Sequence, residues 1–237
     1  MNKILATLKY LFYDFIKGMM IYYGIILGIC VVLVLLYLQF WQSVGGRIGM
    51  SFSNISVIFI FIAGLNSFKN SFKFLQANNV TRKSFYIASI ILFAGVSALM
   101  TLIDWVIFYS MRHITHGENI YEQLYNANSS FLPAFAISTA FMSMTVTSGF
   151  FITMLYYKCS SLMKVIVSIS PGIVFAIIFW LDTTTDGAIA AGLLRFASAA
   201  LGVNPFNPNM AVLSFSILFA AAAALSYLLL RRMTIKD

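Results

Sequence analysis

Few residues in this chain could carry out catalytic chemistry. The two histidines, His113 and His116, stand together in a polar segment, apart from any serine that could act with them inside an apolar run. The sequence contains neither a Gly-x-x-x-x-Gly-Lys-Ser/Thr phosphate loop nor a His-Glu-x-x-His pair. We therefore predict no catalytic residue, no bound cofactor and no metal site, and we expect any ATP chemistry to belong to another protein.

Asp104 is the one acidic residue within a long hydrophobic run. An ionisable residue at membrane depth suggests a proton or ion pathway, so a carrier coupled through Asp104 is one hypothesis. However, Asp104 lies close to Trp105 and Tyr109, an aromatic grouping typical of a membrane interface. The pattern therefore favours a position near the outer membrane surface.

Residues 66–79 have the pattern of a short amphipathic helix. Phe68, Phe72 and Leu75 recur at helical spacing, and Lys69 and Lys73 follow the neighbouring stripe. Such a helix could dock into a groove on a soluble partner, or it could lie flat on lipid. Asn78 and Asn79 are a plausible stop, because asparagine tolerates the left-handed conformation that ends many helices.

The composition places these residues in a membrane protein. The 237 residues are 61% hydrophobic and 9% charged, whereas soluble domains carry about 25% charged residues. A helix that crosses a bilayer needs about 20 mostly apolar residues. We predict an all-α polytopic membrane protein with one transmembrane domain over residues 1–237, which excludes an ordinary soluble enzyme. The six expected spans are residues 20–40, 53–67, 85–110, 131–157, 164–181 and 209–230.

The basic residues predict the orientation of these spans. Twelve of the fifteen fall on one side of the six-span arrangement, and Arg47, Arg112 and Arg195 fall on the other. Since cytoplasmic loops are enriched in lysine and arginine, both termini should be cytoplasmic and the protein should lie in the cytoplasmic membrane. The net charge of +8 then reflects topology and attraction to anionic lipid, and it implies no nucleic-acid partner.

Two further segments do not read as simple spans. Residues 1–19 predict an amphipathic helix in the inner interface before the first span, with a cytoplasmic extension of that span as the alternative. Residues 183–208, which include Arg195, Pro205 and Pro208, predict external helices that re-enter the outer leaflet. The alternative for this second segment is a seventh crossing.

Gly24 and Gly28 form a small-residue surface in the first span. Glycines at this spacing allow two helices to approach closely. The surface could serve a subunit contact or packing within the bundle, and we favour packing.

One local string and the overall layout resemble a known family. Residues 76–86, Gln-Ala-Asn-Asn-Val-Thr-Arg-Lys-Ser-Phe-Tyr, precede an apolar span and resemble a segment of bacterial ABC exporter permeases of the type-2 class, with Asn79 where glycine is usual. These permeases occur in peptide and bacteriocin export and in immunity. Six spans, internal termini, a cytoplasmic coupling helix and external re-entrant helices extend the resemblance over the whole chain.

The resemblance implies a permease that pairs with a second copy or a sibling permease and binds separate ATPase subunits, which would hold ATP and magnesium. The cargo would be a peptide-like or lipid-like molecule. Phe68, Phe72 and Leu75 would then be the ridge gripped by the ATPase. Lys69, Lys73, Arg82 and Lys83 would orient that ridge or bind lipid phosphates.

Two other functional classes are compatible with the sequence. An ion- or proton-coupled carrier that uses Asp104 would transport without ATP. A membrane sensor or scaffold that transports nothing would show the same topology. Transport by the first route should fail in Asp104→Asn.

Overall fold

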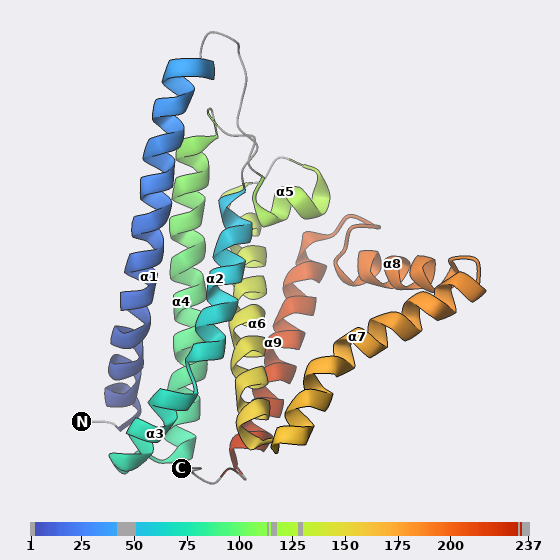
Figure 1. The fold of residues 1–237 in the computed structure, drawn as a ribbon. Helices are drawn as coiled ribbons and strands as arrows, with labels where there is room; N and C mark the ends of the chain where they lie inside the picture. Colours follow the sequence, from blue (N-terminus) through green and yellow to red (C-terminus); the bar gives the residue numbers. More distant parts are fainter. Residues whose placement is uncertain are drawn as a thin grey trace.

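The computed structural model describes residues 3–41, 51–112, 114, 118–127, 130–231 and 233, and all its regular elements within these ranges are helices (Figure 1). Among the described residues, six helices are long and apolar enough to cross a membrane. The elements are α1 (Lys3–Leu36), which continues as a π-helical turn (Tyr37–Trp41), α2 (Phe52–Asn66), α3 (Lys69–Ala77), α4 (Arg82–Met111), α5 (Ile120–Tyr125), α6 (Phe131–Lys158), α7 (Ser161–Thr184), α8 (Ala188–Ala200) and α9 (Pro208–Arg231).

The six expected spans correspond to α1, α2, α4, α6, α7 and α9, with boundaries close to those predicted except at the start of α1. The helices run alternately up and down, so the first turn of α1 and the last turn of α9 lie at the same end of the molecule (Figure 1). This arrangement fits a multi-pass membrane protein with an even number of crossings.

The segment predicted as an interfacial helix, residues 1–19, is continuous with the first span from Lys3 onward, which agrees with the alternative of an extended first span. Residues 3–36 form one continuous helix of 34 residues, about 50 Å long at ~1.5 Å per residue. No proline interrupts this segment, and the same helical face stays buried from Thr7 and Leu11 through Met19 to Ile26 and Cys30. The apolar stripe predicted to meet lipid packs mainly against α4 instead.

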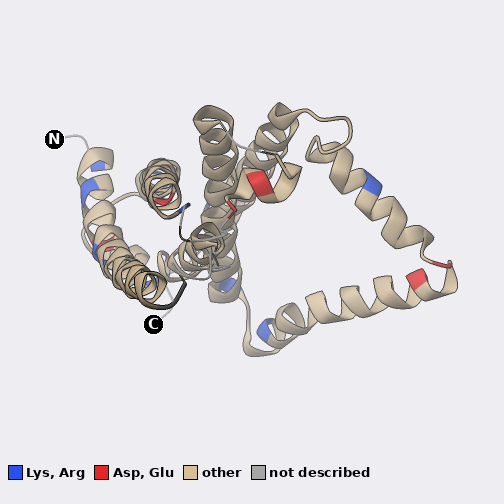
Figure 2. Cartoon of the chain, turned by 90° about the horizontal axis from the view of Figure 1, so that it is seen from above, with Lys and Arg blue, Asp and Glu red and all other residues tan. Residues whose placement is uncertain are grey.

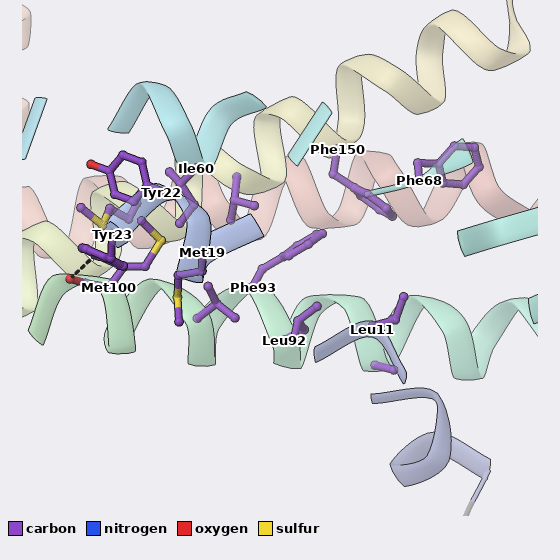
Figure 3. Close-up of a cluster of buried hydrophobic side chains, with 14 of the residues drawn as sticks. Leu11, Met19, Tyr22, Tyr23, Ile60, Phe68, Leu92, Phe93, Met100 and Phe150 are labelled. Atoms are coloured by element: carbon purple, nitrogen blue, oxygen red, sulfur yellow. Dashed lines mark hydrogen bonds between the residues drawn. The ribbon is translucent and has the colours of Figure 1, made fainter. Parts of the chain in front are cut away.

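The core joins α1, α2, α4 and α6 through large side chains. Met19 and Tyr23 of α1 meet Leu92, Phe93 and Met100 of α4, and Ile60 and Phe150 close the cluster from α2 and α6 (Figure 3). α9 packs against the other side of α6. We call α1, α2, α4, α6 and α9 the bundle.

A pair of glycines sets the crossing of α2 and α6. A Cβ atom on Gly149 would lie 2.6 Å from the carbonyl oxygen of Phe61, and one on Gly64 would overlap the carbonyl oxygen of Val146. Thr153 donates a hydrogen bond of 2.6 Å to the carbonyl oxygen of Leu65 in the same crossing. Only glycine permits this approach of the two backbones, because any side chain would force them apart.

The helices α7 and α8 form a separate arm. α7 leans away from the bundle and α8 runs back toward α9, so that the two outline a wide angle (Figures 1 and 2). Not one residue of α7 or α8 is buried. Pro171 lies inside α7, and the helix continues through it.

The segment 183–208 contains α8, whose 13 residues span only about 20 Å. Such a helix is too short for a seventh crossing. Arg195 is exposed on α8, Pro205 lies in the following turn and Pro208 begins α9. Re-entry of this segment into the outer leaflet stays a prediction.

Candidate functional site

The short helix predicted over residues 66–79 exists as α3, at the same end of the molecule as the first turn of α1 and the last turn of α9 (Figure 1). It ends as the asparagines indicated. Asn79 is left-handed, with φ of 56°, and the amide of Asn78 donates to the carbonyl oxygen of Phe74. Thr81 then caps α4 by accepting a hydrogen bond from the backbone N–H of Ser84.

The aromatic ridge of α3 faces the bundle, not the surroundings. Phe68 and Phe72 are fully buried and Leu75 is 4% exposed. The Phe68 ring stacks on Phe72 at 4.9 Å between centroids and meets the edges of Phe150 and Tyr157. The expectation that an ATPase grips these three side chains is therefore corrected, because side chains enclosed by α4 and α6 offer a partner no surface.

The other side of α3 is available for a contact. Lys69, Asn70, Phe74 and Ala77 are exposed and Lys73 is half-buried, and together we call them the outer face of α3. The Phe74 ring stacks on Tyr10 of α1 at 4.8 Å. The ridge thus anchors α3 to the bundle while the outer face presents cations and an aromatic ring.

The two basic residues that follow α3, Arg82 and Lys83, have different surroundings. The guanidinium of Arg82 donates to the carbonyl oxygen of Arg231 at 3.3 Å, which ties the start of α4 to the carboxyl end of α9 where carbonyl groups lack helical partners. Lys83 is exposed. Of the two, Lys83 is the one left for a phosphate or an acidic partner.

Charge separates the two ends of the molecule. Four of the acidic residues lie at or just before α5 and at the corner of the arm, and Figure 1 shows α5 and this corner away from the end that carries α3. They are Glu118, Glu122, Asp182 and Asp186. Arg112 and Arg195 also lie toward that end, whereas Arg47, Arg232, Lys236 and both histidines fall outside the described residues. The basic residues at the α3 end are Lys3, Lys9, Lys69, Lys73, Arg82, Lys83, Lys158, Lys164 and Arg231.

Gly24 and Gly28 do not pack within the chain. Both are exposed on α1, and a Cβ atom on either would meet nothing within 4 Å. Packing inside the bundle was the favoured interpretation and it is wrong, because the buried stripe of α1 runs through Tyr22, Tyr23 and Ile26 instead. A contact with a second subunit stays a prediction for these two glycines.

Asp104 faces the interior of the bundle, close to the residue that caps α5. Its side chain is 5% exposed, and its Oδ1 atom accepts a hydrogen bond of 2.9 Å from the hydroxyl of Tyr23. The same hydroxyl lies 3.1 Å from the carbonyl oxygen of Met100, so its single proton is shared between these two acceptors (Figure 3). Next to it, Tyr22 and Ser56 share a hydrogen bond of 2.7 Å. The position near the membrane surface that Trp105 and Tyr109 indicated stays a prediction.

The end of the molecule opposite α3 carries a short helix, α5, that the predicted spans did not include. α5 begins with a capping box in which Asn119 and Glu122 satisfy each other's backbone N–H groups, so the Asn-x-x-Glu spacing was the available signal. Tyr125 donates to the carbonyl oxygen of Leu201 at 2.7 Å and meets the ring of Phe206 edge-on. Burial, followed by the nearby Tyr121, raises the pKa of Tyr125, so its hydroxyl stays a donor at neutral pH.

Comparison with known proteins identifies no relative. No family model, no curated protein and no solved structure matches this chain. The described residues also hold no group of three or more histidine, cysteine, aspartate or glutamate side chains placed to bind a metal. Functional reasoning for this protein therefore rests on its own residues.

Proposed function

We propose that the protein is the membrane-spanning permease subunit of an ATP-driven exporter. It would work in the cytoplasmic membrane with both termini on the cytoplasmic side, paired with a second copy or a sibling permease. Separate ABC-type ATPase subunits would bind ATP and magnesium, so the chain itself would not be an enzyme. The proposal rests on the six apolar helices, the separation of charge between the two ends and the position of α3.

The observation that carries the proposal is the two-sided environment of α3. One side is interlocked with α4 and α6 through Phe68, Phe72 and Leu75, and the outer face is exposed at the basic end. A push on the outer face would pass into the spanning helices, because close-packed aromatic rings transmit displacement with little give. A helix that merely lies on lipid has no need of such an anchor.

The proposed cargo is an amphipathic or hydrophobic molecule of peptide type. Two observations support this class. The chain holds 23 phenylalanines and 12 tyrosines, and a groove of about 360 Å³ between α6 and α9 combines rings with hydroxyl groups. The groove is lined in part by Phe135, Phe219, Thr139, Ser143 and Ser216.

Anionic lipid is proposed as a further partner at the basic end. A groove between α1 and α4 is walled by Leu5, Leu8, Phe12 and Ile91 and carries Lys9. An acyl chain would fit the apolar walls, and the ammonium group would attract a lipid phosphate.

The decisive experiment is co-purification from the native membrane in mild detergent. We expect an ATPase subunit to elute with the wild-type chain, and we expect Lys69→Glu combined with Ala77→Glu to reduce its recovery at least tenfold. Lys164→Glu is the matched control, since Lys164 is exposed at the same end but belongs to the arm. Phe72→Asp is not a useful test, because a buried charge would unfold the anchor. Equal recovery of the ATPase with all variants would contradict the proposal.

A second candidate function is a carrier driven by an ion or proton gradient. The burial of Asp104 and its hydrogen bond to Tyr23 favour it, because acids within membrane bundles mark such pathways. The carrier would move cargo into proteoliposomes that lack ATP and any ATPase, and Asp104→Asn would abolish this uptake. Transport that strictly requires a co-purified ATPase would exclude it.

A further inference from the structure

A small cavity lies beside Asp104, enclosed by residues of α2, α4 and α6 and by the residue that caps α5. Its free volume of about 10 Å³ suits one water-sized occupant and nothing larger. Apolar side chains such as Trp105 and Met142 form part of the wall. The lining residues whose side chains contain oxygen are Ser53, Thr101, Asp104, Asn119 and Ser138.

The carboxylate of Asp104 is only half satisfied by the chain. The Tyr23 hydroxyl lies at Oδ1 and the Ser56 hydroxyl lies near the carboxyl group, whereas Oδ2 is buried and meets the geometry of no hydrogen bond among the described residues. No residue that lines the cavity carries a positive charge. An ionised carboxylate in such a place is costly unless an opposite charge neutralises it or the group takes up a proton, so Oδ2 would be satisfied either by a bound cation or by a proton.

The remaining oxygens suit a small cation better than an anion or an apolar group. The Thr101 hydroxyl donates toward the sulfur of Met142 at 3.5 Å, which leaves its lone pairs free to face the cavity. Ser53 and Ser138 are 8% and 7% exposed and add two more hydroxyl oxygens. One carboxylate among neutral oxygens matches a hard monovalent cation in charge and in ligand type.

We propose that this cavity is a sodium-binding site, with Asp104 as the charged ligand and the hydroxyls of Ser53, Thr101 and Ser138 as neutral ligands. Tyr23 positions the carboxylate so that Oδ2 points to the ion. Bound sodium would join α2, α4 and α6 directly and α1 through Tyr23. The site is independent of any ATPase and extends beyond the proposed export function.

The test is the effect of sodium on the purified full-length protein. Thermal unfolding in detergent is measured in sodium chloride and in choline chloride at equal ionic strength and constant pH, together with binding of radioactive ²²Na⁺. We expect sodium to raise the unfolding temperature by several degrees in a saturable way, since a ligand that binds only the folded state stabilises it. Asp104→Asn should remove both the shift and the ²²Na⁺ binding.

Two further variants keep the test decisive if Asp104→Asn folds poorly. Thr101→Val and Ser138→Ala retain the carboxylate and each remove one hydroxyl, so each should weaken sodium binding severalfold. Asp14→Asn is the control, because Asp14 is an exposed acid on α1, and its sodium response should equal that of the wild type. The proposal is overturned if the wild type binds no ²²Na⁺ or if Asp104→Asn retains the response. It is also overturned if, in a parallel series at several pH values, the unfolding temperature changes with pH but never with sodium.

Discussion

The bundle and the arm are built from equally apolar helices, yet they bury very different fractions of themselves. In α4 twelve side chains are buried, including Phe85, Phe93 and Met100, whereas α7 buries none. The buried faces of α4 and α6 combine large apolar side chains with small residues, namely serine and threonine in both helices and glycine in α6. In contrast, α7 is rich in Ile, Val and Phe. Hydropathy therefore indicates which helices enter a membrane, and small or polar residues on one face indicate which of them pack together.

Removing a phenylalanine ring should give the largest difference in stability between the bundle and the arm. Phe150 is fully buried against Phe68 and Phe93, whereas Phe175 is 74% exposed. Phe150→Ala should lower the free energy of unfolding by about 3 kcal/mol because it leaves a cavity, and Phe175→Ala should change it by less than ~0.5 kcal/mol. Thermal unfolding can be followed by the reaction of buried Cys30 with a thiol dye in a Cys159→Ser background. Equal losses would mean that the arm is also packed.

A methyl group added to a glycine tests backbone contact in the same two regions. Gly149→Ala places a Cβ atom 2.6 Å from the Phe61 carbonyl oxygen and should destabilise the protein by roughly 1–3 kcal/mol. Gly172 of the arm has nothing within 4 Å of such an atom, so Gly172→Ala should be neutral or stabilising by up to ~1 kcal/mol through helix propensity. The same unfolding assay compares them, and a neutral Gly149→Ala would refute the tight crossing.

The tether between the arm and α5 gives a smaller effect. Tyr125→Phe deletes the hydrogen bond to Leu201 and should lower stability by about 0.5–1.5 kcal/mol. Proteolysis should also become faster at residues 201–207, which connect the arm to α9. Tyr109→Phe is the control, because Tyr109 is 55% exposed and belongs to the bundle. Unchanged cleavage in Tyr125→Phe would show that the tether does not hold the arm.

Helix caps give the smallest predicted difference. Thr81 caps α4 through a 3.1 Å hydrogen bond from the Ser84 N–H, whereas Ser160 precedes α7 without a capping side-chain bond. Thr81→Ala should cost roughly 0.5–1 kcal/mol, and Ser160→Ala should cost close to nothing. A similar loss in both variants, measured by the Cys30 assay, would show that α7 depends on its cap after all.

The positions of the helices were predictable because the length of an apolar run and the residues at its ends set a span. The direction in which each helix turns its apolar face was harder to predict. The spacing of Phe68, Phe72 and Leu75 predicted an amphipathic α3, but periodicity does not say whether the apolar side meets a partner or the chain's own core. Gly24 and Gly28 have the spacing of a helix-packing motif but touch no other helix, whereas Gly64 and Gly149 lie at a close helix crossing. A close approach depends on a second helix far away in the sequence, which no local pattern reveals.

Asp104 shows the same limit for the candidate ion site. Its isolation among apolar residues was visible in the sequence, but its contact with Tyr23, 81 positions away, depends on how α1 packs against α4. The hydroxyl groups of Ser53 and Ser138 reach the same cavity from two further helices. Such a site is assembled by tertiary packing and carries no spacing signature of its own.

The packing of α9 on α6 has a consequence for how the protein is made. These two helices contact each other more extensively than any other pair, yet the arm separates them along the chain. During synthesis α6 must enter the membrane with its future contact face covered only by lipid, and α7 and α8 must be inserted before the last helix arrives. The contact between α6 and α9 can therefore form only after the whole arm has been synthesised.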